Sequence, residues 1–99
     1  MNKTKIYLSL PITGFDLDEV KVRAEKLKQE ILTERPDAEV ITPFDVCDEP
    51  GLSYGEYLGR DIAALLGCDA IHLCEGWLGS KGCKLEYKAA RLYGLKIYS

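Results

Sequence analysis

The sequence predicts one α/β domain, in which a parallel sheet of about four strands is covered by helices on both faces. Short, nearly continuous apolar segments alternate with longer segments of helical periodicity in the order β-α-β-α-β-α-β. Strands buried on both faces of a parallel sheet have this composition. The chain of 99 residues contains no internal repeat and no linker, and this length suffices for one compact core. We therefore treat residues 1–99 as a single domain.

The first strand is expected over residues 5–10, and Pro11 ends it. A long helix follows, capped by Asp16 or Asp18. Its apolar residues recur at the spacing of one helix face, at Val20, Ala24, Leu27 and Ile31. The segment around Pro36 breaks this helix, because proline disrupts helical hydrogen bonding.

The second strand is expected over residues 38–42, directly before Pro43. An irregular segment then extends from Phe44 to Ser53. It is longer than a typical connection, and loops of this length often form lids or binding loops. A second helix is expected over residues 54–66.

The third strand is expected over residues 69–74, followed by a loop over residues 75–81. A third helix covers residues 82–93, Gly94 ends it, and the last strand covers residues 95–98. Ligands of open parallel sheets bind beyond the carboxyl ends of the strands. The candidate site is therefore expected where the strands end.

The composition argues against several classes of function. A net charge of −3 without a basic stripe argues against a polynucleotide partner. No apolar run approaches the roughly 20 residues that span a bilayer, and the N-terminal residues lack the hydrophobic stretch of a signal peptide. We therefore expect a cytoplasmic protein without a membrane partner. The four cysteines lack the CxxC spacing of zinc and redox motifs, so we expect reduced, mostly buried thiols, no metal site and no cofactor.

Glu86 is the most unusual residue of the chain. In a projection of the third helix it lies near the middle of the apolar arc, opposite Lys81, Lys84, Lys88 and Arg91. A carboxylate in that position costs free energy unless it is paired or opens onto a cleft. A buried partner such as a tyrosine or a backbone N–H would give Glu86 a structural role, and catalysis is the alternative. Periodicity leaves both open.

Asp61 is a weaker candidate on the second helix. It lies on the shoulder of the apolar stripe, beside Arg60, where a solvated residue or a salt-bridge partner is the simpler explanation. Two carboxylates that converge on one cleft can divide nucleophile and acid–base duties at an acetal-like carbon. Only this pairing with Glu86 gives Asp61 functional interest.

The start of the third helix offers free N–H groups. Ser80 is a natural N-cap between Gly79 and Gly82, and such a helix N-terminus can bind an anion. A plain cap without a ligand is the alternative. Trp77, just upstream, would either stack on a base or cover the edge of the core.

Several segments, in this order along the chain, together resemble the nucleoside 2-deoxyribosyltransferase-like superfamily. The similarity is greatest to its short phage and bacterial branch, which is related to 2′-deoxynucleoside 5′-phosphate N-hydrolases. The matching segments cover nearly the whole chain and are Lys5 to Gly14, Thr42-Pro43-Phe44-Asp45, Arg60-Asp61-Ile62, Cys68-Asp69-Ala70-Ile71, Gly76-Trp77, and Ser80-Lys81-Gly82 through to Glu86-Tyr87. The resemblance implies a flavodoxin-like or Rossmann-like domain and chemistry at C1′ of a deoxyribosyl group.

The resemblance also implies roles for individual residues. Glu86 matches the nucleophile, which forms a glycosyl-enzyme ester that water or a second base resolves. Asp61 matches the aspartate that assists at the leaving base, and Tyr7 matches an aromatic residue that helps to hold the nucleophile. Ser80 matches the serine that contacts the 5′-phosphate in the nucleotide-hydrolysing branch. The other expected substrate-binding residues are Pro11, Gly14, Asp45, Trp77 and Gly82.

The chain departs from the family pattern at its first loop and at its end. Leu10 stands where the family often has glycine, and Pro11 and Thr13 replace polar and arginine contacts to phosphate. Family sites are commonly completed by the C-terminal segment of a neighbouring subunit, whereas this sequence ends at Ser99, directly after its last expected strand. A homodimer or a higher homo-oligomer is still expected.

Together these observations predict an N-glycosidase or deoxyribosyltransferase that acts on a 2′-deoxynucleoside or its 5′-monophosphate. The alternative is a non-catalytic binding module for a nucleotide or nucleotide-sugar on the same fold, which Leu10 and the short C-terminus favour. In both cases the expected partner is a small nucleoside or nucleotide. The base, the sugar and the acceptor stay open at this stage.

Overall fold

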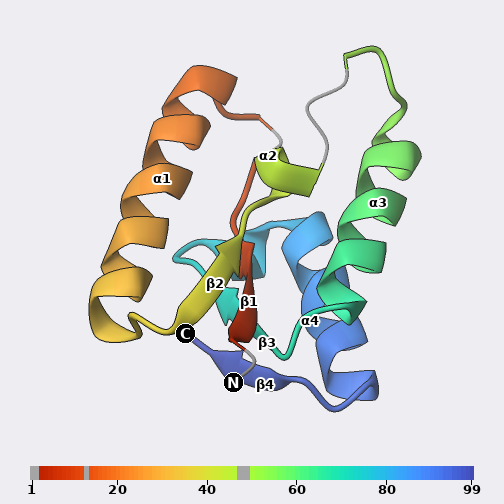
Figure 1. The fold of residues 1–99 in the computed structure, drawn as a ribbon. Coiled ribbons are helices and arrows are strands. Elements are labelled where there is room, and N and C mark those ends of the chain that lie inside the picture. Colours follow the sequence, from red (N-terminus) through yellow and green to blue (C-terminus); the bar gives the residue numbers. More distant parts are fainter. Residues whose placement is uncertain (1–2, 13, 47–49) are drawn as a thin grey trace.

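A computed structural model describes residues 3–12, 14–46 and 50–99. Its centre is a four-stranded parallel sheet with the strand order β2-β1-β3-β4 (Figure 1). The strands are β1 (Thr4–Ser9), β2 (Ala38–Ile41), β3 (Ala70–Leu73) and β4 (Lys96–Tyr98). The predicted parallel sheet is confirmed, and each strand lies within one residue of its expected bounds.

β1 is a central strand and carries residues that face both layers of helices. Ile6 lies opposite Val40 of β2 and Ala70 of β3, so β1 has a hydrogen-bonded neighbour on each side. Its last four residues, from Ile6 to Ser9, are fully buried. Because side chains alternate along a strand, Tyr7 and Ser9 point to the same face of the sheet. The two side chains therefore face the same layer of helices.

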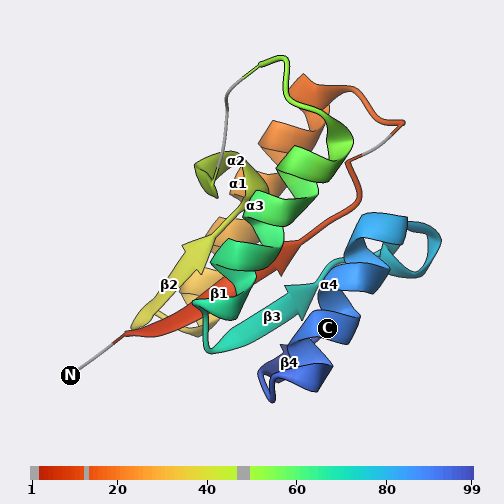
Figure 2. The ribbon, with the colours of Figure 1, turned by 90° about the vertical axis from the view of Figure 1, so that its right-hand side faces the viewer.

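Helices cover both faces of the sheet, as predicted. α1 (Leu17–Glu34) packs on one face, together with the cluster that contains Ile6 and Leu8. α3 (Tyr54–Leu66) and α4 (Lys81–Leu92) pack on the opposite face, with the cluster that contains Tyr7. Figure 2 shows α3 and α4 in front of the sheet, with α1 behind it.

The structure departs from the prediction directly after β2. Pro43–Val46 forms a short helix, α2, where only irregular chain was expected. Proline favours the first helical position because its φ angle is already helical. The Asp45 N–H also donates to Thr42 Oγ1 at 3.3 Å, which caps the first turn. Residues 47–49 of the expected irregular segment lie outside the described residues.

Side-chain caps fix where the longer helices begin. Asp16, rather than Asp18, caps α1 by accepting a hydrogen bond from the Glu19 N–H at 3.1 Å. Ser80 caps α4, as expected, by accepting from the Cys83 N–H at 3.3 Å. α4 therefore begins at Lys81, one residue earlier than predicted, after a short 3₁₀ turn over Trp77–Gly79 (η1).

The cysteines and the hydropathy of the helices fit a folded core. Cys68, Cys74 and Cys83 are buried free thiols, while Cys47 lies outside the described residues. Within the ranges that the structure describes, every helix is too short or too polar to cross a bilayer.

Candidate active site

The centre of the candidate site is the Glu86 carboxylate, which accepts one hydrogen bond on each oxygen. The Tyr7 hydroxyl donates to Glu86 Oε2 and the Ser9 hydroxyl donates to Glu86 Oε1, both at 2.7 Å. Both donors belong to β1 and both point toward α4, since they are two residues apart on one strand. The sheet and the helix therefore meet at this carboxylate.

Glu86 is only 4% exposed. This burial agrees with its place on the apolar face in the helix projection. A buried ionised carboxylate is stable only when its oxygens are hydrogen-bonded or paired. Tyr7 and Ser9 supply those bonds, which agrees with the structural explanation of Glu86. The carboxylate also reaches a cavity, which agrees with the catalytic one.

A cavity of about 390 Å³ opens at this carboxylate. Asp61 of α3 and Glu86 of α4 both line it. The structure thus brings together the two carboxylates that the sequence suggested. The rest of the wall is mainly apolar and aromatic, and is formed by Leu10, Ile12, Leu17, Lys21, Pro43, Phe44, Pro50, Tyr54, Tyr57, Leu58, Ser80, Gly82 and Cys83.

Burial and hydrogen bonding act in opposite directions on Glu86. Burial raises the pKa of the Glu86 carboxyl above its usual value, and the hydrogen bonds from Ser9 and Tyr7 offset only part of this rise. For Tyr7, burial and then the negative charge of Glu86 raise the pKa far above its usual value. The phenol of Tyr7 therefore keeps its proton and remains a hydrogen-bond donor to Glu86.

Asp61, which lines the same cavity from α3, has a different environment. Burial, and then the negative charge of Glu86, raise the pKa of Asp61 from 3.8 to about 7. A carboxyl group with such a pKa holds a proton in part of the molecules at neutral pH. Both carboxyls thus have raised pKa values, and at Asp61 the charge of Glu86 is one of the causes.

Ser80 and Gly82, both expected in the site, line the cavity at the start of α4. A side chain at Gly82 would bring its Cβ within 3.2 Å of the Tyr54 hydroxyl oxygen, so glycine leaves room for that aromatic ring. Pro11 lines a second hollow of about 700 Å³ that shares Tyr54, Ser80 and Gly82 with the first.

Two expected residues, Gly14 and Trp77, lie away from the cavity wall. Gly14 adopts a φ of 89°, as a turn glycine does, and lines neither hollow. Trp77 packs against Tyr87, with ring centroids 4.9 Å apart, and contacts the core cluster beside α4. Of its two expected positions, Trp77 has the one at the edge of the core. Thr13, which stands where the resembled family has a contact to phosphate, lies outside the described residues.

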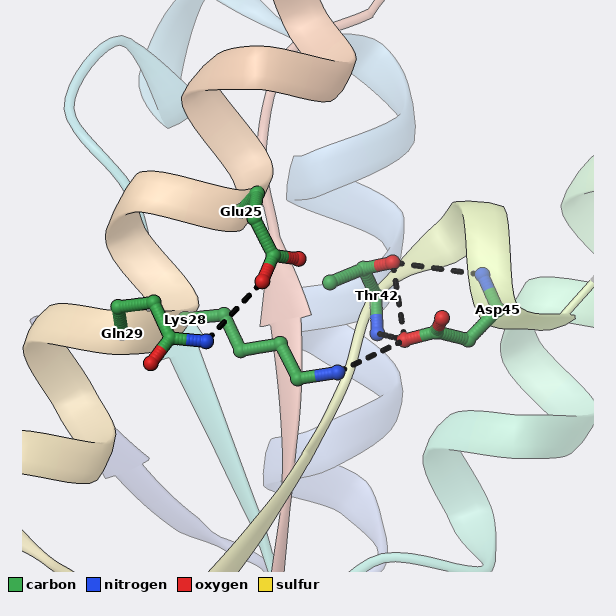
Figure 3. Close-up of polar contacts among 5 residues, drawn as sticks. All are labelled: Glu25, Lys28, Gln29, Thr42 and Asp45. Carbon is green, nitrogen blue, oxygen red and sulfur yellow. Dashed lines mark hydrogen bonds and ion pairs between the residues drawn. The ribbon is translucent and has the colours of Figure 1, made fainter.

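Asp45 also turns away from the cavity. Its Oδ2 accepts hydrogen bonds from the Thr42 N–H at 3.0 Å and from the Thr42 hydroxyl at 3.1 Å. The same oxygen lies 3.8 Å from Lys28 Nζ of α1 (Figure 3). Through these contacts Asp45 of α2 is bonded to the residue that follows β2 and lies close to α1.

Sequence reasoning missed Ser9 and the aromatic wall. Ser9 follows Tyr7 by two residues in an expected strand, so its side chain had to share the face of Tyr7; that signal was available. Phe44 and Tyr57 line the cavity from α2 and α3, and no local pattern in the sequence marks them. In the part of the chain that the structure describes, no three His, Cys, Asp or Glu side chains cluster as metal ligands.

The fold has a counterpart among solved structures. The chain is similar to a "2-desoxiribosyltransferase from Leishmania mexicana", with a TM-score of 0.68 and 16% sequence identity. The match covers 95% of this chain and 61% of that one, so this chain spans less than two thirds of its relative's length. The likeness confirms the expected α/β fold of the deoxyribosyltransferases.

The sequence itself places the chain in a family. Residues 4–99 match the family described as "Domain of unknown function (DUF4406)". The protein belongs to this family. Comparison with curated proteins gives no match.

Proposed function

We propose that the protein cleaves or transfers the N-glycosidic bond of a 2′-deoxynucleoside or its 5′-monophosphate, with Glu86 as nucleophile. One observation carries the proposal: a buried carboxylate, bonded on both oxygens by neutral hydroxyls, lines a cavity together with a second carboxyl group. The two hydroxyls that bond to Glu86 are neutral, so they leave its negative charge in place for a reacting carbon.

The first step forms an ester. A Glu86 oxygen attacks C1′ while the C1′–N bond breaks, and the electron pair of that bond moves to the base nitrogen. Asp61 gives its proton to the departing base. The leaving base is thereby neutral, and the deoxyribosyl group is attached to Glu86.

The second step releases the sugar. Water or an acceptor base attacks C1′ from the other side, and the C1′–O bond of the ester breaks. The electron pair returns to Glu86 as a carboxylate, and Asp61 takes the proton of the attacking group. Water as acceptor gives hydrolysis, and a base gives transfer.

The proton affinities of the two carboxyls support this division of roles. The negative charge of Glu86 is one of the causes that raise the pKa of Asp61 to about 7. An ionised Glu86, as a nucleophile must be, therefore favours the protonated form of Asp61. The hydroxyls of Tyr7 and Ser9 favour that ionised form.

The shape and chemistry of the cavity suit a nucleoside. About 390 Å³ lies within the range of small-ligand sites. Phe44, Tyr54 and Tyr57 line it, and aromatic rings stack on bases. The similar solved protein is named a 2-desoxiribosyltransferase, and the proposal extends that chemistry to this chain. We also propose that the protein is cytoplasmic and forms a homo-oligomer.

A second candidate, a nucleotide or nucleotide-sugar binding module, is favoured by one observation. Leu10 lines the cavity at the position where the resembled family often has glycine. A bulky side chain there narrows the approach of a sugar to the backbone. Such a protein would bind its ligand without turnover.

A single assay separates the two candidates. The purified protein is incubated with each 2′-deoxynucleoside and each 5′-monophosphate, with and without a free acceptor base, and the products are separated by chromatography. Release or exchange of base is expected from at least one substrate, and Glu86→Gln protein serves as the inactive control. If no substrate changes over hours while calorimetry shows nucleotide binding, the enzyme proposal is wrong and the binding module replaces it.

A further inference from the structure

We infer that Ser9 is a positioning residue for Glu86: its hydroxyl holds Oε1 in place and keeps the carboxylate ionised inside an apolar wall. The positioning role rests on the proposed function, in which Glu86 is the nucleophile. The control of ionisation rests on geometry alone. The two parts can therefore be tested separately.

The position of Ser9 leaves little freedom to its hydroxyl. Ser9 is the last residue of β1 and is fully buried. Its Oγ lies 2.7 Å from Glu86 Oε1, at the short end of hydroxyl–carboxylate hydrogen bonds. Tyr7, two residues earlier, reaches the other oxygen at the same distance.

Two donors on two oxygens define the plane of the carboxylate. One hydrogen bond would let the group rotate about its last side-chain bond, because that torsion is soft. The Ser9 and Tyr7 hydroxyls, held by one rigid strand, remove this rotation. Each Glu86 oxygen still has a free lone-pair direction, so an oxygen can be aimed at C1′ without breaking either bond.

The same two bonds also act on the charge state of Glu86, against the effect of burial. Burial alone favours the protonated acid, which is a poor nucleophile. A hydrogen bond donated to the carboxylate favours the ionised form, and Ser9 supplies one of the two such bonds. Without Ser9, Oε1 would be a buried anionic oxygen without its hydroxyl partner.

Other titratable and charged groups face Glu86 from the elements packed around it. Tyr7 on β1 bonds to it, and the groups that line its cavity are Asp61, Tyr54 and Tyr57 on α3, Cys83 on α4 and Lys21 on α1. Burial raises the pKa of both the Tyr7 phenol and the Cys83 thiol, so these two keep their protons through the acidic range. Asp61 is the carboxyl whose titration is coupled to that of Glu86.

The deciding measurement is a titration of Glu86 itself. Protein labelled with ¹³C at the glutamate carboxyl carbons is titrated by NMR, and the Glu86 signal is assigned by its loss in Glu86→Gln. In Ser9→Ala the pKa of Glu86 is expected to rise by about one unit, the size of a lost hydrogen bond to a charged group. Ser9→Thr, which keeps a hydroxyl, is expected to restore most of the wild-type value.

Thr42→Val is the matched control. Thr42 is another buried hydroxyl residue at the end of a strand, 5% exposed, but its hydroxyl bonds to Asp45 and not to Glu86. Its loss is expected to leave the pKa of Glu86 unchanged. Thermal melts of all variants check that each one is folded.

Turnover gives the second readout. In Ser9→Ala the acid limb of kcat/KM is expected to move up by the same unit as the Glu86 pKa, and kcat to fall about tenfold with little change in KM. An unchanged Glu86 pKa in folded Ser9→Ala overturns the inference, whatever the activity. A shifted pKa in a protein that turns over no deoxynucleoside or monophosphate overturns the proposed function and leaves the control of ionisation by Ser9 in place.

Discussion

Two carboxylates near the carboxyl ends of neighbouring strands, Glu86 and Asp45, have different environments and different expected roles. Glu86, beside the end of β1, is buried and accepts hydrogen bonds from the neutral hydroxyls of Tyr7 and Ser9. Asp45, just after β2, is about half exposed and bonds to the Thr42 backbone, the Thr42 hydroxyl and Lys28 (Figure 3). Both were expected at the site from the sequence.

The difference lies in what each environment does to the charge. At Asp45 a lysine and a backbone N–H satisfy the carboxylate, and water screens what remains. At Glu86 burial makes the charge costly, and two hydroxyls hold it without cancelling it. Under the proposed function, a buried anion stabilised by neutral donors can act on a developing positive charge at C1′, whereas the anion paired with lysine stabilises the fold.

Glu86→Gln should have the largest effect on the Glu86 side of this comparison. Turnover is expected to fall by about 10³-fold or more, because an amide cannot act as the nucleophile. The fold should survive, with an unchanged or slightly higher melting temperature, since glutamine has the same shape and carries no buried charge. Steady-state rates and a thermal melt on the same sample measure both. Wild-type rates in this variant would remove Glu86 from the mechanism.

Asp61→Asn should have the second-largest effect on turnover. Asparagine has no acid proton, so turnover is expected to fall about 10²-fold, with the greatest loss for the poorest leaving bases. In the wild type, kcat/KM should decline as the pH rises through about 7, because Asp61 then loses its proton. The variant should lack this alkaline decline, and a pH–rate profile from pH 5 to 9 would measure it. A profile that keeps the decline would assign it to another group.

The same shift predicts how stability depends on pH. The pKa of Asp61 is higher in the folded state than its ordinary value of 3.8. Between about pH 4 and pH 7 the folded protein therefore binds a proton that the unfolded chain has lost, so raising the pH through this window lowers stability. Melting temperatures of wild type and Asp61→Asn should diverge across that window, with the variant gaining relative to the wild type.

Tyr7→Phe should have a smaller effect than either carboxylate variant. Phenylalanine keeps the packing of the ring and removes only the hydrogen bond to Glu86 Oε2. A charged group that loses one such bond loses about 1.5–3 kcal/mol, so kcat is expected to fall about 10- to 100-fold. The acid limb of kcat/KM should move to higher pH, because the pKa of Glu86 rises. An unmoved acid limb would show that Tyr7 does not control the Glu86 charge.

Most of the fold was predictable because its signals are local. Apolar strands, one long helix with regular spacing, and the caps Asp16 and Ser80 all follow from neighbouring residues. α2 escaped because four residues are too few to show a helical period. The segment Thr42-Pro43-Phe44-Asp45 does carry the spacing of a capping threonine and an acidic residue three positions later, which is a local helix-start signal.

The site was predictable only in part, for a different reason. The position of Glu86 on an apolar helix face is a property of one helix, so the sequence carries it. Its contact with Ser9 joins residues 77 positions apart and depends on which face of β1 meets α4. The position of Trp77 against Tyr87 is likewise set by tertiary packing. Strand periodicity places Ser9 on the same face as Tyr7, but it contains no information about which helix residue that face contacts.

The Asp45 side of the comparison should respond in stability and not in turnover. Asp45→Ala removes the acceptor of the Thr42 N–H and hydroxyl, and is expected to lower the free energy of unfolding by about 1–2 kcal/mol. Lys28→Met, which removes only the partly exposed ion pair, should cost about 0.5 kcal/mol or less. Urea unfolding and steady-state rates on both variants measure this, and rates should stay within about twofold of wild type. The loss of the bonds between Asp45 and Thr42 is expected to change the stability of the fold and not the reaction. A tenfold loss of turnover in folded Asp45→Ala protein would contradict this expectation and would assign Asp45 to substrate binding.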